Sequence, residues 1–334
     1  MNEQQGIKPY VIGLDLGGTN SVFGIVDARG DIKATTAIKT GGFTQAEDYV
    51  NAAVTALEPI IDQVGGLEKI KAMGIGAPNA NYYNGTIEFA PNLPWAHDGV
   101  VPLAKMFSER LGNIPVAMTN DANAAALGEM VYGVARGMKN FIVITLGTGV
   151  GSGIVVNGQL LYGHDGFAGE LGHVTMVRGA EGRICGCGRA GCLETYCSAT
   201  GVARTARELL SKTERPSILR EMNPEDITSL DVSIAASKGD ELAKEVYRRT
   251  GYLLGLGLAN YASIIDPQMI IVTGGVSKAG KWLMEPTRKS FYEHVFGNMR
   301  DSIKIVPSMM NNREREVLGA AALAWTIPEY SLFK

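Results

Sequence analysis

Apolar positions along the first half of the chain alternate between helical spacing and strand-length runs. In residues 45–64 the apolar side chains recur at helical spacing and predict one face of a helix: Tyr49, Val50, Ala53, Val54, Leu57, Ile60, Ile61 and Val64. The other apolar runs are short and continuous, which is typical of buried strands. We expect strands at 10–19, 21–27, 72–78 and 114–119, and an Ala-rich helix at 122–135.

The second half of the chain repeats this alternation. It begins with a strand, a glycine turn and a strand at 141–158, which superposes on the first such unit when the chain is moved by 130 positions. Further helices are expected at 199–212, 240–263, 280–295 and 314–327, and further strands at 268–275 and 303–306. Strands that alternate with helices predict an α/β protein, and the repeat is consistent with two halves built on one plan.

Length and composition narrow the class of protein. The 334 residues correspond to about two domains, and no linker-like stretch separates the halves, so we expect them to share a cleft. With 46% hydrophobic and 19% charged residues, the chain is neither disordered nor a coiled coil. A net charge of -3 argues against nucleic-acid binding through bulk charge. We also expect no membrane segment and no leader, and hence a cytoplasmic protein.

Glycine is in excess, at 42 residues, and two glycine turns stand in corresponding places between strands: Gly17, Gly18 and Thr19, and Gly147, Thr148 and Gly149. Each turn offers successive N–H groups without a side chain in the way, together with a hydroxyl, which suits phosphate oxygens. One such turn alone is also common in ordinary hairpins. Two of them predict a phosphate-binding pair.

Two other phosphate motifs fit less well. Residues 147–153 do not have the G-x-G-x-x-G spacing of a dinucleotide site, and a strand rather than a helix follows them. Residues 275–282 match a P-loop until Trp282, which replaces the hydroxyl that would hold Mg²⁺.

The four cysteines all lie between 185 and 197, which indicates metal binding rather than a disulfide framework. His173, Cys185, Cys187 and Cys192 supply one imidazole and three thiols, a closed tetrahedral set that suits a structural Zn²⁺. The alternative is a loop of reduced cysteines. Cys197 is left over and is expected in the core.

Four carboxylates are candidates for chemistry. Asp15 stands in an apolar strand, where a carboxylate needs a cation or hydrogen bonds. Asp121 begins a helix directly after a strand, and a simple N-cap role is the alternative. Glu170 and Glu194 flank the predicted metal ligands and would be held near one another, although each also suits a solvated surface position.

Seven motifs together resemble the ROK family of sugar kinases and repressors, within the actin/hexokinase-like ATPase superfamily. They occur in the family's order and cover nearly the whole chain: DLGGTN (15–20), NLPW (92–95), ND (120–121), LGTGVGSG (146–153), GELGH (169–173), CGCGRAGCLE (185–194) and VTGG (272–275). The most specific of them is the pairing of E-x-G-H with C-x-C-G-x-x-G-C-x-E.

The resemblance implies a two-domain actin-like ATPase fold, of the ribonuclease H-like type, with sugar and ATP in the cleft between the domains. We expect a smaller N-terminal α/β domain at 1–118 plus 314–334, and a larger C-terminal domain with the zinc-binding loop at 119–313. The resemblance further implies a homodimer, or in some relatives a tetramer, with no nucleic-acid or membrane partner.

The resemblance also assigns roles within the site. The two glycine turns would contact the ATP phosphates, Gly274 and Gly275 would approach the adenosine, and Asp15 would orient Mg²⁺ through water. Sugar contacts are implied for Asn92, Asn120, Asp121, Glu170, His173 and Glu194. Asp121 would act as the general base, and His173 would bind both zinc and a sugar hydroxyl.

The expected activity is that of an ATP-dependent hexose kinase, with glucose as the first candidate sugar. Alternative acceptors are N-acetylmannosamine, N-acetylglucosamine and fructose. A sugar-responsive transcriptional regulator of the same family is disfavoured, because only 14 residues precede Asp15, too few for a helix-turn-helix domain. Two departures from the family pattern, Pro78-Asn79 for Pro-Gly and the short NLPW loop, bear on the identity of the sugar.

Overall fold

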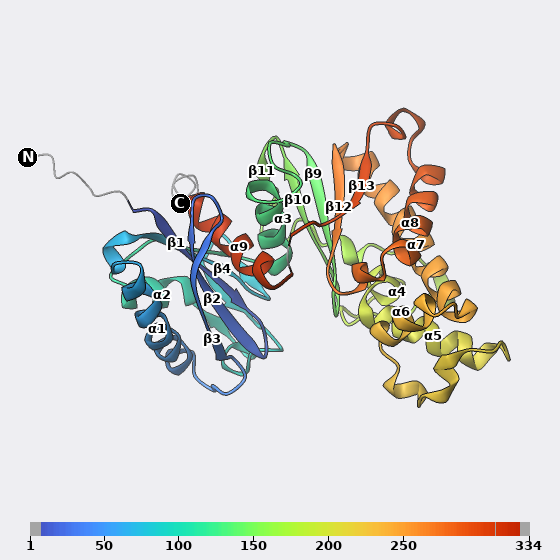
Figure 1. Ribbon diagram of the computed structural model, residues 1–334, viewed down its shortest axis with the longest axis horizontal. Helices are drawn as coiled ribbons and strands as arrows, with labels where there is room; N and C mark the ends of the chain where they lie inside the picture. The colour runs from blue at the N-terminus through green and yellow to red at the C-terminus, as the bar shows by residue number, and fades with distance from the viewer. Residues whose placement is uncertain (1–7, 311, 328–334) are drawn as a thin grey trace, which may run out of the picture. The chain divides into compact units, whose positions relative to one another are not determined.

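The computed structural model describes residues 8–310 and 312–327, which form two compact units of mixed α/β structure (Figure 1). Unit 1 consists of the described residues of Met1–Gly137, Leu160–Ala168 and Met309–Lys334. Unit 2 consists of Met138–Gln159 and Gly169–Ser308. The expected α/β class is therefore confirmed.

Unit 1 is built on a five-stranded sheet in the order β3-β2-β1-β4-β8. Its strands are β1 (Tyr10–Leu16), β2 (Asn20–Asp27), β3 (Ile32–Lys39), β4 (Ile70–Gly76) and β8 (Val116–Thr119). The first three strands pair antiparallel, whereas β4 pairs parallel with both β1 and β8. A small antiparallel sheet lies beside it, formed by β5 (Ala80–Asn81), β6 (Thr86–Glu88) and β7 (Val100–Val101).

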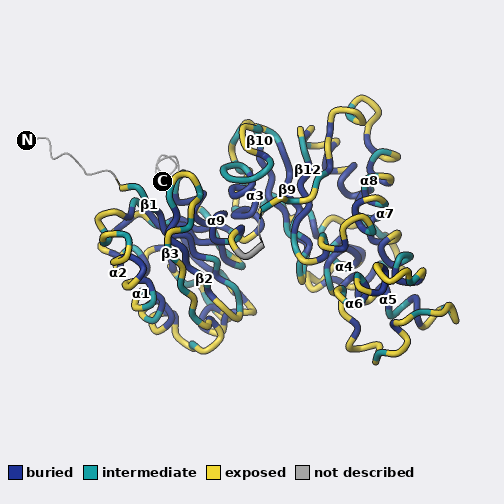
Figure 2. The backbone as a smooth tube through the Cα atoms, viewed as in Figure 1, coloured by how far each residue is buried: buried dark blue, intermediate teal, exposed yellow. Residues whose placement is uncertain are grey.

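Helices cover both faces of the unit 1 sheet. Ile12, Leu14 and Leu16 of β1 belong to the core that also holds α1 (Ala46–Gln63) and α2 (Leu103–Arg110), whereas Val11 belongs to the core with α3 (Asp121–Val131) and α9 (Asn312–Trp325). The predicted apolar face of α1 is confirmed, since all of it but the half-buried Val54 and Val64 is buried, and solvent meets the other face (Figure 2).

Unit 2 repeats the arrangement of the unit 1 sheet. Its strands run in the order β11-β10-β9-β12-β13, with β9 and β10 antiparallel and β12 parallel to both β9 and β13. They are β9 (Phe141–Leu146), β10 (Val150–Val156), β11 (Gln159–Leu160), β12 (Met269–Thr273) and β13 (Lys304–Pro307). The sequence repeat at an offset of 130 thus corresponds to β1–turn–β2 and β9–turn–β10, and the plan of two similar halves is confirmed.

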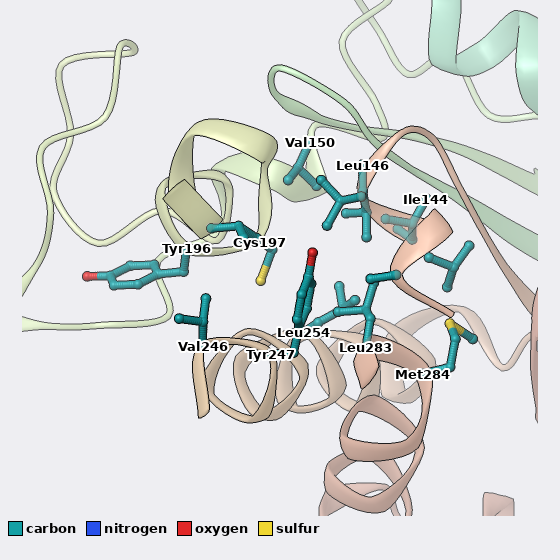
Figure 3. Packing of buried hydrophobic residues seen from close by; sticks show 14 of the residues in the cluster. Ile144, Leu146, Val150, Tyr196, Cys197, Val246, Tyr247, Leu254, Leu283 and Met284 are labelled. Atoms are coloured by element: carbon teal, nitrogen blue, oxygen red, sulfur yellow. The ribbon is translucent and has the colours of Figure 1, made fainter. Parts of the chain in front are cut away.

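Five helices complete unit 2: α4 (Glu194–Cys197), α5 (Ala199–Lys212), α6 (Ser229–Ser237), α7 (Glu241–Ile265) and α8 (Lys281–His294). Their buried side chains meet those of β9 and β10 in one apolar cluster (Figure 3). Cys197 is fully buried in this cluster, and its thiol donates to the Thr250 carbonyl at 3.5 Å, which confirms the expected core position.

The division into units differs from the expected one around α3. Residues 119–137 were expected in the C-terminal domain, but Leu127 of α3 packs with Val317 and Leu318 of α9 in a core of unit 1. Residues 160–168 also return to unit 1, where the Tyr162 ring stacks on Tyr82 with centroids 3.6 Å apart. Apolar contact between segments distant in sequence decides this boundary, and no local pattern reports it.

Among residues 8–310 and 312–327, no helix has both the length and the apolar composition that crossing a membrane requires.

The helices α7 and α8 approach one another closely at Gly255. A Cβ atom at this position would lie 2.3 Å from the Thr287 carbonyl oxygen and 2.7 Å from the Phe291 nitrogen, both backbone atoms of α8. At Gly257, two residues along α7, a Cβ would meet only Leu193 at 3.4 Å and the Tyr261 hydroxyl at 3.5 Å, which are ordinary contacts.

We predict that Gly255→Ala and Gly257→Ala have different effects on stability. Gly255→Ala forces the helices apart and should lower the free energy of unfolding by about 2 kcal/mol or more. Gly257→Ala adds helix propensity without a clash and should leave it unchanged or raise it by up to about 1 kcal/mol. Denaturant melts of both variants measure the difference, and equal destabilisation would contradict the close approach at Gly255.

Candidate functional site

The first glycine turn connects β1 to β2 and lies against Asn92. Gly17 N donates to Asn20 O at 3.0 Å, and Thr40 N donates to Thr19 O at 2.8 Å, so the turn is fixed from both sides. A Cβ atom on Gly18 would lie 3.1 Å from the Asn92 Cβ atom and from its carbonyl oxygen. The structure therefore brings the predicted sugar contact Asn92 beside the predicted phosphate turn.

Asp15 lies on β1 directly before this turn, between Val22 of β2 and Gly76 of β4. Burial, and then the negative charges of Glu316 and Asp121, raise the pKa of Asp15 to about 7, whereas Arg315 opposes the shift. Arg315 is itself paired with Glu316 at 3.1 Å. Excess negative charge next to a half-buried carboxyl is the environment that a divalent cation would neutralise.

Asp121 is the first residue of α3, but it is not the N-cap. Asn120 is the N-cap, since its Oδ1 accepts a hydrogen bond from Asn123 N at 2.7 Å. The Asp121 carboxylate accepts from its neighbour Ala122 N at 2.8 Å and keeps accessible surface. Partial desolvation by the surrounding protein raises the pKa of Asp121, and the hydrogen bond from Ala122 opposes the shift. The simple N-cap interpretation of Asp121 is therefore wrong.

Asn79, which departs from the family's Pro-Gly pattern, stands at the start of the small sheet of unit 1. Its φ of 53° is in the left-handed region, which Asn tolerates better than most residues. Its amide donates to the carbonyls of Glu88 at 3.0 Å and Phe89 at 3.2 Å. The side chain thus fixes the strand end that leads to Asn92.

The second glycine turn, in unit 2, connects β9 to β10 and is held by the helices that follow the cysteine-rich loop. Ala199 N donates to Gly147 O at 2.8 Å, and the Thr200 hydroxyl donates to Thr148 O at 3.3 Å. Glu194 Oε2 accepts from Val150 N at 2.9 Å. The carbonyls of the turn are therefore directed toward α5, and the N–H group of Val150, just after the turn, is directed toward Glu194 of α4.

Gly274 and Gly275 lie at the end of β12, whose Thr273 is in register with Thr145 of β9. A Cβ atom on Gly274 would lie 2.4 Å from the carbonyl oxygen of Leu146, the residue before the second glycine turn. The structure therefore places the predicted adenosine contact Gly274 beside the predicted phosphate turn of the same unit.

The segment Gly169–His173 carries Glu170 and His173 and lies against β10. The Ser152 hydroxyl donates to the Gly169 carbonyl, and Leu171 N donates to the same hydroxyl at 3.4 Å. Glu170 Oε2 lies 3.8 Å from His173 Nε2, while His173 Nδ1 lies 3.6 Å from Cys185 Sγ. One ring nitrogen of His173 thus faces the cysteines and the other faces Glu170.

The four predicted metal ligands form one cluster. The ligand atoms of His173, Cys185, Cys187 and Cys192 all lie within 4.8 Å of one another, and the sulfurs of Cys187 and Cys192 are 3.7 Å apart. Sulfurs about 2.3 Å from a tetrahedral Zn²⁺ are separated by about 3.8 Å. The donor set and its spacing therefore fit zinc.

The thiols of the cluster differ in their pKa values. Hydrogen bonds from Arg189, first from its backbone N–H and then from its side chain, lower the pKa of Cys187 to about 6. Burial raises the pKa of Cys185 to about 12. One thiolate is thus favoured at neutral pH, and a metal ion would displace the remaining thiol protons when it binds.

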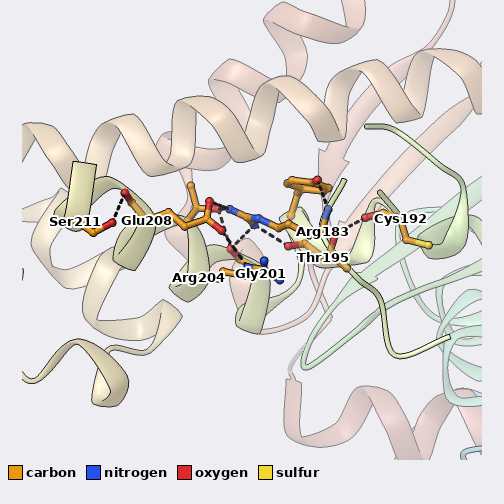
Figure 4. Close-up of polar contacts among 9 residues, drawn as sticks. Arg183, Cys192, Thr195, Gly201, Arg204, Glu208 and Ser211 are labelled. Carbon is orange, nitrogen blue, oxygen red and sulfur yellow. Dashed lines mark hydrogen bonds and ion pairs between the residues drawn. The ribbon is translucent and has the colours of Figure 1, made fainter. Parts of the chain in front are cut away.

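Arg183, just before the first ligand cysteine, was missed by the sequence analysis. It is 7% exposed, and its guanidinium donates to Thr195 O at 2.7 Å, Gly201 O at 3.2 Å and Glu208 Oε2 at 2.7 Å (Figure 4). The same group lies over the Tyr196 ring, 4.5 Å from its centroid. Arg183 therefore ties the cysteine-rich loop to the helices that hold the second glycine turn. A single arginine in a glycine-rich stretch gives no sequence signal for this.

A hollow of about 880 Å³ lies next to Arg183 but contains none of the predicted ligands. Its arginines are already paired with carboxylates: Arg204 with Glu208 at 3.0 Å, and Arg249 with Glu245 at 2.9 Å. We therefore do not assign the predicted chemistry to this hollow.

Comparison with known proteins gives one consistent result. The model of the ROK family matches residues 11–327. A glucokinase from Streptomyces coelicolor is 39% identical over 319 residues, which cover 94% of this chain and 96% of the relative. A crystal structure of a ROK family glucokinase from Streptomyces griseus, in complex with glucose and AMPPNP, is 36% identical, with a TM-score of 0.76 and coverage of 95% of this chain and 99% of the other.

The same comparison also finds regulators. A xylose repressor from Caldicellulosiruptor bescii is 31% identical over 267 residues, which cover 78% of this chain and 65% of the repressor. The expected actin-like ATPase fold is confirmed by the similar structures, and the motif-based resemblance is confirmed by the family match.

We predict that Asp15 makes the stability of the free protein depend on pH. The folded chain holds this proton until the pH nears about 7, whereas the unfolded chain releases it near 3.8. The folded state binds more protons between these values, so the free energy of unfolding falls as the pH rises through this window. Asp15→Asn should therefore melt at a higher temperature than the wild type at about pH 8 and at the same temperature at about pH 4.

Asp98→Asn is the matched control, because the Asp98 side chain is 94% exposed. Thermal melts without added Mg²⁺ or nucleotide should show no such pH-dependent gain for this variant. An Asp15→Asn protein that gains nothing at high pH would contradict the raised pKa.

Proposed function

The chain belongs to the ROK family, and on this premise we propose that it is an ATP-dependent glucokinase, which converts glucose and ATP to glucose 6-phosphate and ADP. The observation that carries the proposal is the likeness over 95% of the chain to a glucokinase crystallised with glucose and AMPPNP. The two glycine turns, Asp121 and the histidine-cysteine cluster support it from the chain's own residues.

Asp121 is the proposed general base. A sugar hydroxyl is a poor nucleophile, and a carboxylate within hydrogen-bond reach can accept its proton as it attacks the γ-phosphorus in line. Partial desolvation raises the pKa of Asp121 from that of a free aspartate, which makes it a better proton acceptor. Asn120, whose Oδ1 caps α3, holds the backbone that positions the carboxylate.

Further sugar contacts are proposed for Asn92, Glu170, His173 and Glu194. Phosphate contacts are proposed for the N–H groups and hydroxyls of the two turns: Gly17, Gly18, Thr19, Gly147, Thr148 and Gly149. Gly274 and Gly275 would border the adenosine, and Asp15 would hold the water shell of Mg²⁺. The bound Mg²⁺ would neutralise charge on the phosphate oxygens.

The proposed zinc site is structural. His173, Cys185, Cys187 and Cys192 would fill all four positions of a tetrahedral ion, which leaves none for a reacting water. Because His173 Nε2 faces Glu170 while Nδ1 faces Cys185, the ion would fix the ring that the sugar meets.

A homodimer, which the family resemblance implies, and a cytoplasmic location, which the sequence pattern predicts, also remain proposals. Size-exclusion chromatography with light scattering distinguishes a monomer, dimer and tetramer. The rival activity, sugar-responsive gene regulation, is supported by the likeness to xylose repressors. Specific, sugar-sensitive binding to genomic fragments in a gel shift, without kinase activity, would support that rival.

The sugar itself is identified by coupled ADP release with a panel of acceptors. We expect the highest kcat/KM for glucose, above N-acetylmannosamine, N-acetylglucosamine and fructose. If no hexose is phosphorylated, the kinase proposal fails.

Asp121→Asn should lower kcat by on the order of 10² or more, because the amide cannot accept the proton. Glucose binding, measured by calorimetry, should persist, since Asn keeps the size and the hydrogen-bonding oxygen of Asp. Asp98→Asn, at an exposed loop position, should retain wild-type kcat. Full activity in the Asp121→Asn protein would remove Asp121 as the base.

Purified protein should contain about one Zn²⁺ per chain by elemental analysis. Cys187→Ser should lose most of the metal and lower the melting temperature. Cys197→Ala removes a thiol that is buried in the core and outside the cluster, and it should retain the metal. A folded, active, metal-free wild-type protein would contradict the zinc proposal.

A further inference from the structure

Tyr261 of α7 reaches the segment that carries Glu170 and His173. The side chain is 2% exposed, and its hydroxyl donates to the Leu171 carbonyl oxygen at 2.6 Å. Leu171 begins the 3₁₀ turn Leu171–His173, whose N-cap is Glu170. A tyrosine 90 positions away in sequence therefore binds the middle of this segment.

The segment Gly169–His173 is also held by β10 and by the cysteine-rich loop, and Leu171 N in its middle donates to the Ser152 hydroxyl at 3.4 Å. The Ser152 hydroxyl of β10 binds the Gly169 carbonyl at one end, and Arg189 donates to the His173 carbonyl at 2.6 Å at the other. The hydrogen bond from Tyr261 is the contact that ties the middle of the segment to α7, a helix of 25 residues. Without this bond to α7, the side chains of Glu170 and His173 would have more freedom to reorient.

The bond to Tyr261 is not needed to satisfy the Leu171 carbonyl. Val174 N also donates to this oxygen, at 3.2 Å, so removal of the tyrosine hydroxyl leaves no bare buried acceptor. Burial raises the pKa of Tyr261, so the hydroxyl keeps its proton and remains a donor at neutral and alkaline pH. A Phe at this position should therefore fold, while the segment loses its anchor.

We propose that Tyr261 is a positioning residue for sugar recognition, which acts through the Leu171 carbonyl to fix the orientation of Glu170 and His173. This inference rests on the proposed function, in which those two side chains contact the sugar. Tyr261 itself is buried, and within the part of the chain that the structure describes its hydroxyl bonds to the Leu171 carbonyl rather than to a metal ligand or a glycine turn.

Tyr247 offers a matched control on the same helix. It is also a buried tyrosine, 1% exposed, and its hydroxyl donates to a backbone carbonyl, that of Ser229 at 3.2 Å, in the first turn of α6 (its position in the core is seen in Figure 3). Tyr247→Phe therefore removes the same kind of bond from α7 without affecting the segment Gly169–His173.

The experiment compares the full-length wild-type, Tyr261→Phe and Tyr247→Phe proteins by steady-state kinetics and by amide hydrogen exchange. Loss of one neutral hydrogen bond corresponds to a change of about fivefold in an equilibrium constant. We expect Tyr261→Phe to raise the KM for glucose by about fivefold and to leave the KM for ATP and kcat within about twofold. Exchange should accelerate in residues 169–174 in this variant alone, whereas Tyr247→Phe should keep wild-type kinetics.

Equal sugar KM values for the two variants would overturn the proposal. So would an effect of Tyr261→Phe that is spread evenly over kcat and both KM values, because that is the result of general loosening. If the wild type phosphorylates no sugar, the proposed function fails, and unchanged exchange in residues 169–174 would separately show that Tyr261 does not anchor the segment.

Discussion

The arrangement of unit 2 depends on one constraint: the backbone between Gly169 and Ala199 has little regular secondary structure, yet its polar groups must be hydrogen-bonded where they are buried. Irregular backbone–backbone bonds satisfy part of this stretch, such as Cys185 N to Arg189 O at 2.8 Å and Leu193 N to Val174 O at 3.0 Å, and side chains satisfy other groups. Ser152 and Tyr261 bind carbonyls at the start of this stretch, and Arg183 binds the carbonyls of Thr195 and Gly201 near and just beyond its end. The predicted metal ligands lie in the same stretch, so these side-chain bonds and the backbone bonds of the loop together position them.

The same stretch also positions the second glycine turn. The backbone N–H of Ala199 and the hydroxyl of Thr200 bind the turn's carbonyls, and Glu194 binds the N–H that follows it. The first turn has a different support, since it lies against Asn92 in a loop that Asn79 helps to fix. Two turns of the same design, in sheets of the same strand order, are thus held by unrelated segments. This is how one structural plan can carry two different binding surfaces.

Most of the strands and helices and the cluster of four metal ligands could be predicted from the sequence. Apolar periodicity indicates which positions are buried, and the spacing of the cysteines indicates a set of metal ligands. The strand β3 was not predicted, because its positions alternate only between half-buried and exposed and it contains no strongly apolar run. The two-residue strands β5 and β7 are too short for any period. Arg183 and Tyr261 could not be found either, since their importance comes from carbonyls that only the fold brings near. The assignment of α3 to unit 1 was missed for the same reason: its partner α9 lies almost 200 positions further along the chain.

The helix α7 both packs in the core of unit 2 and holds the segment that carries two of the proposed sugar contacts. Its buried side contacts α8 at Gly255, the start of α6 through Tyr247 and the segment before the cysteines through Tyr261. Its outer side exposes Tyr252 and Ile264, which are 47% and 78% accessible. An engineer who seeks a more heat-resistant variant should therefore work on the outer positions, where better helix formers add stability at little risk to recognition. Substitutions on the buried side of α7 would alter stability and substrate preference together.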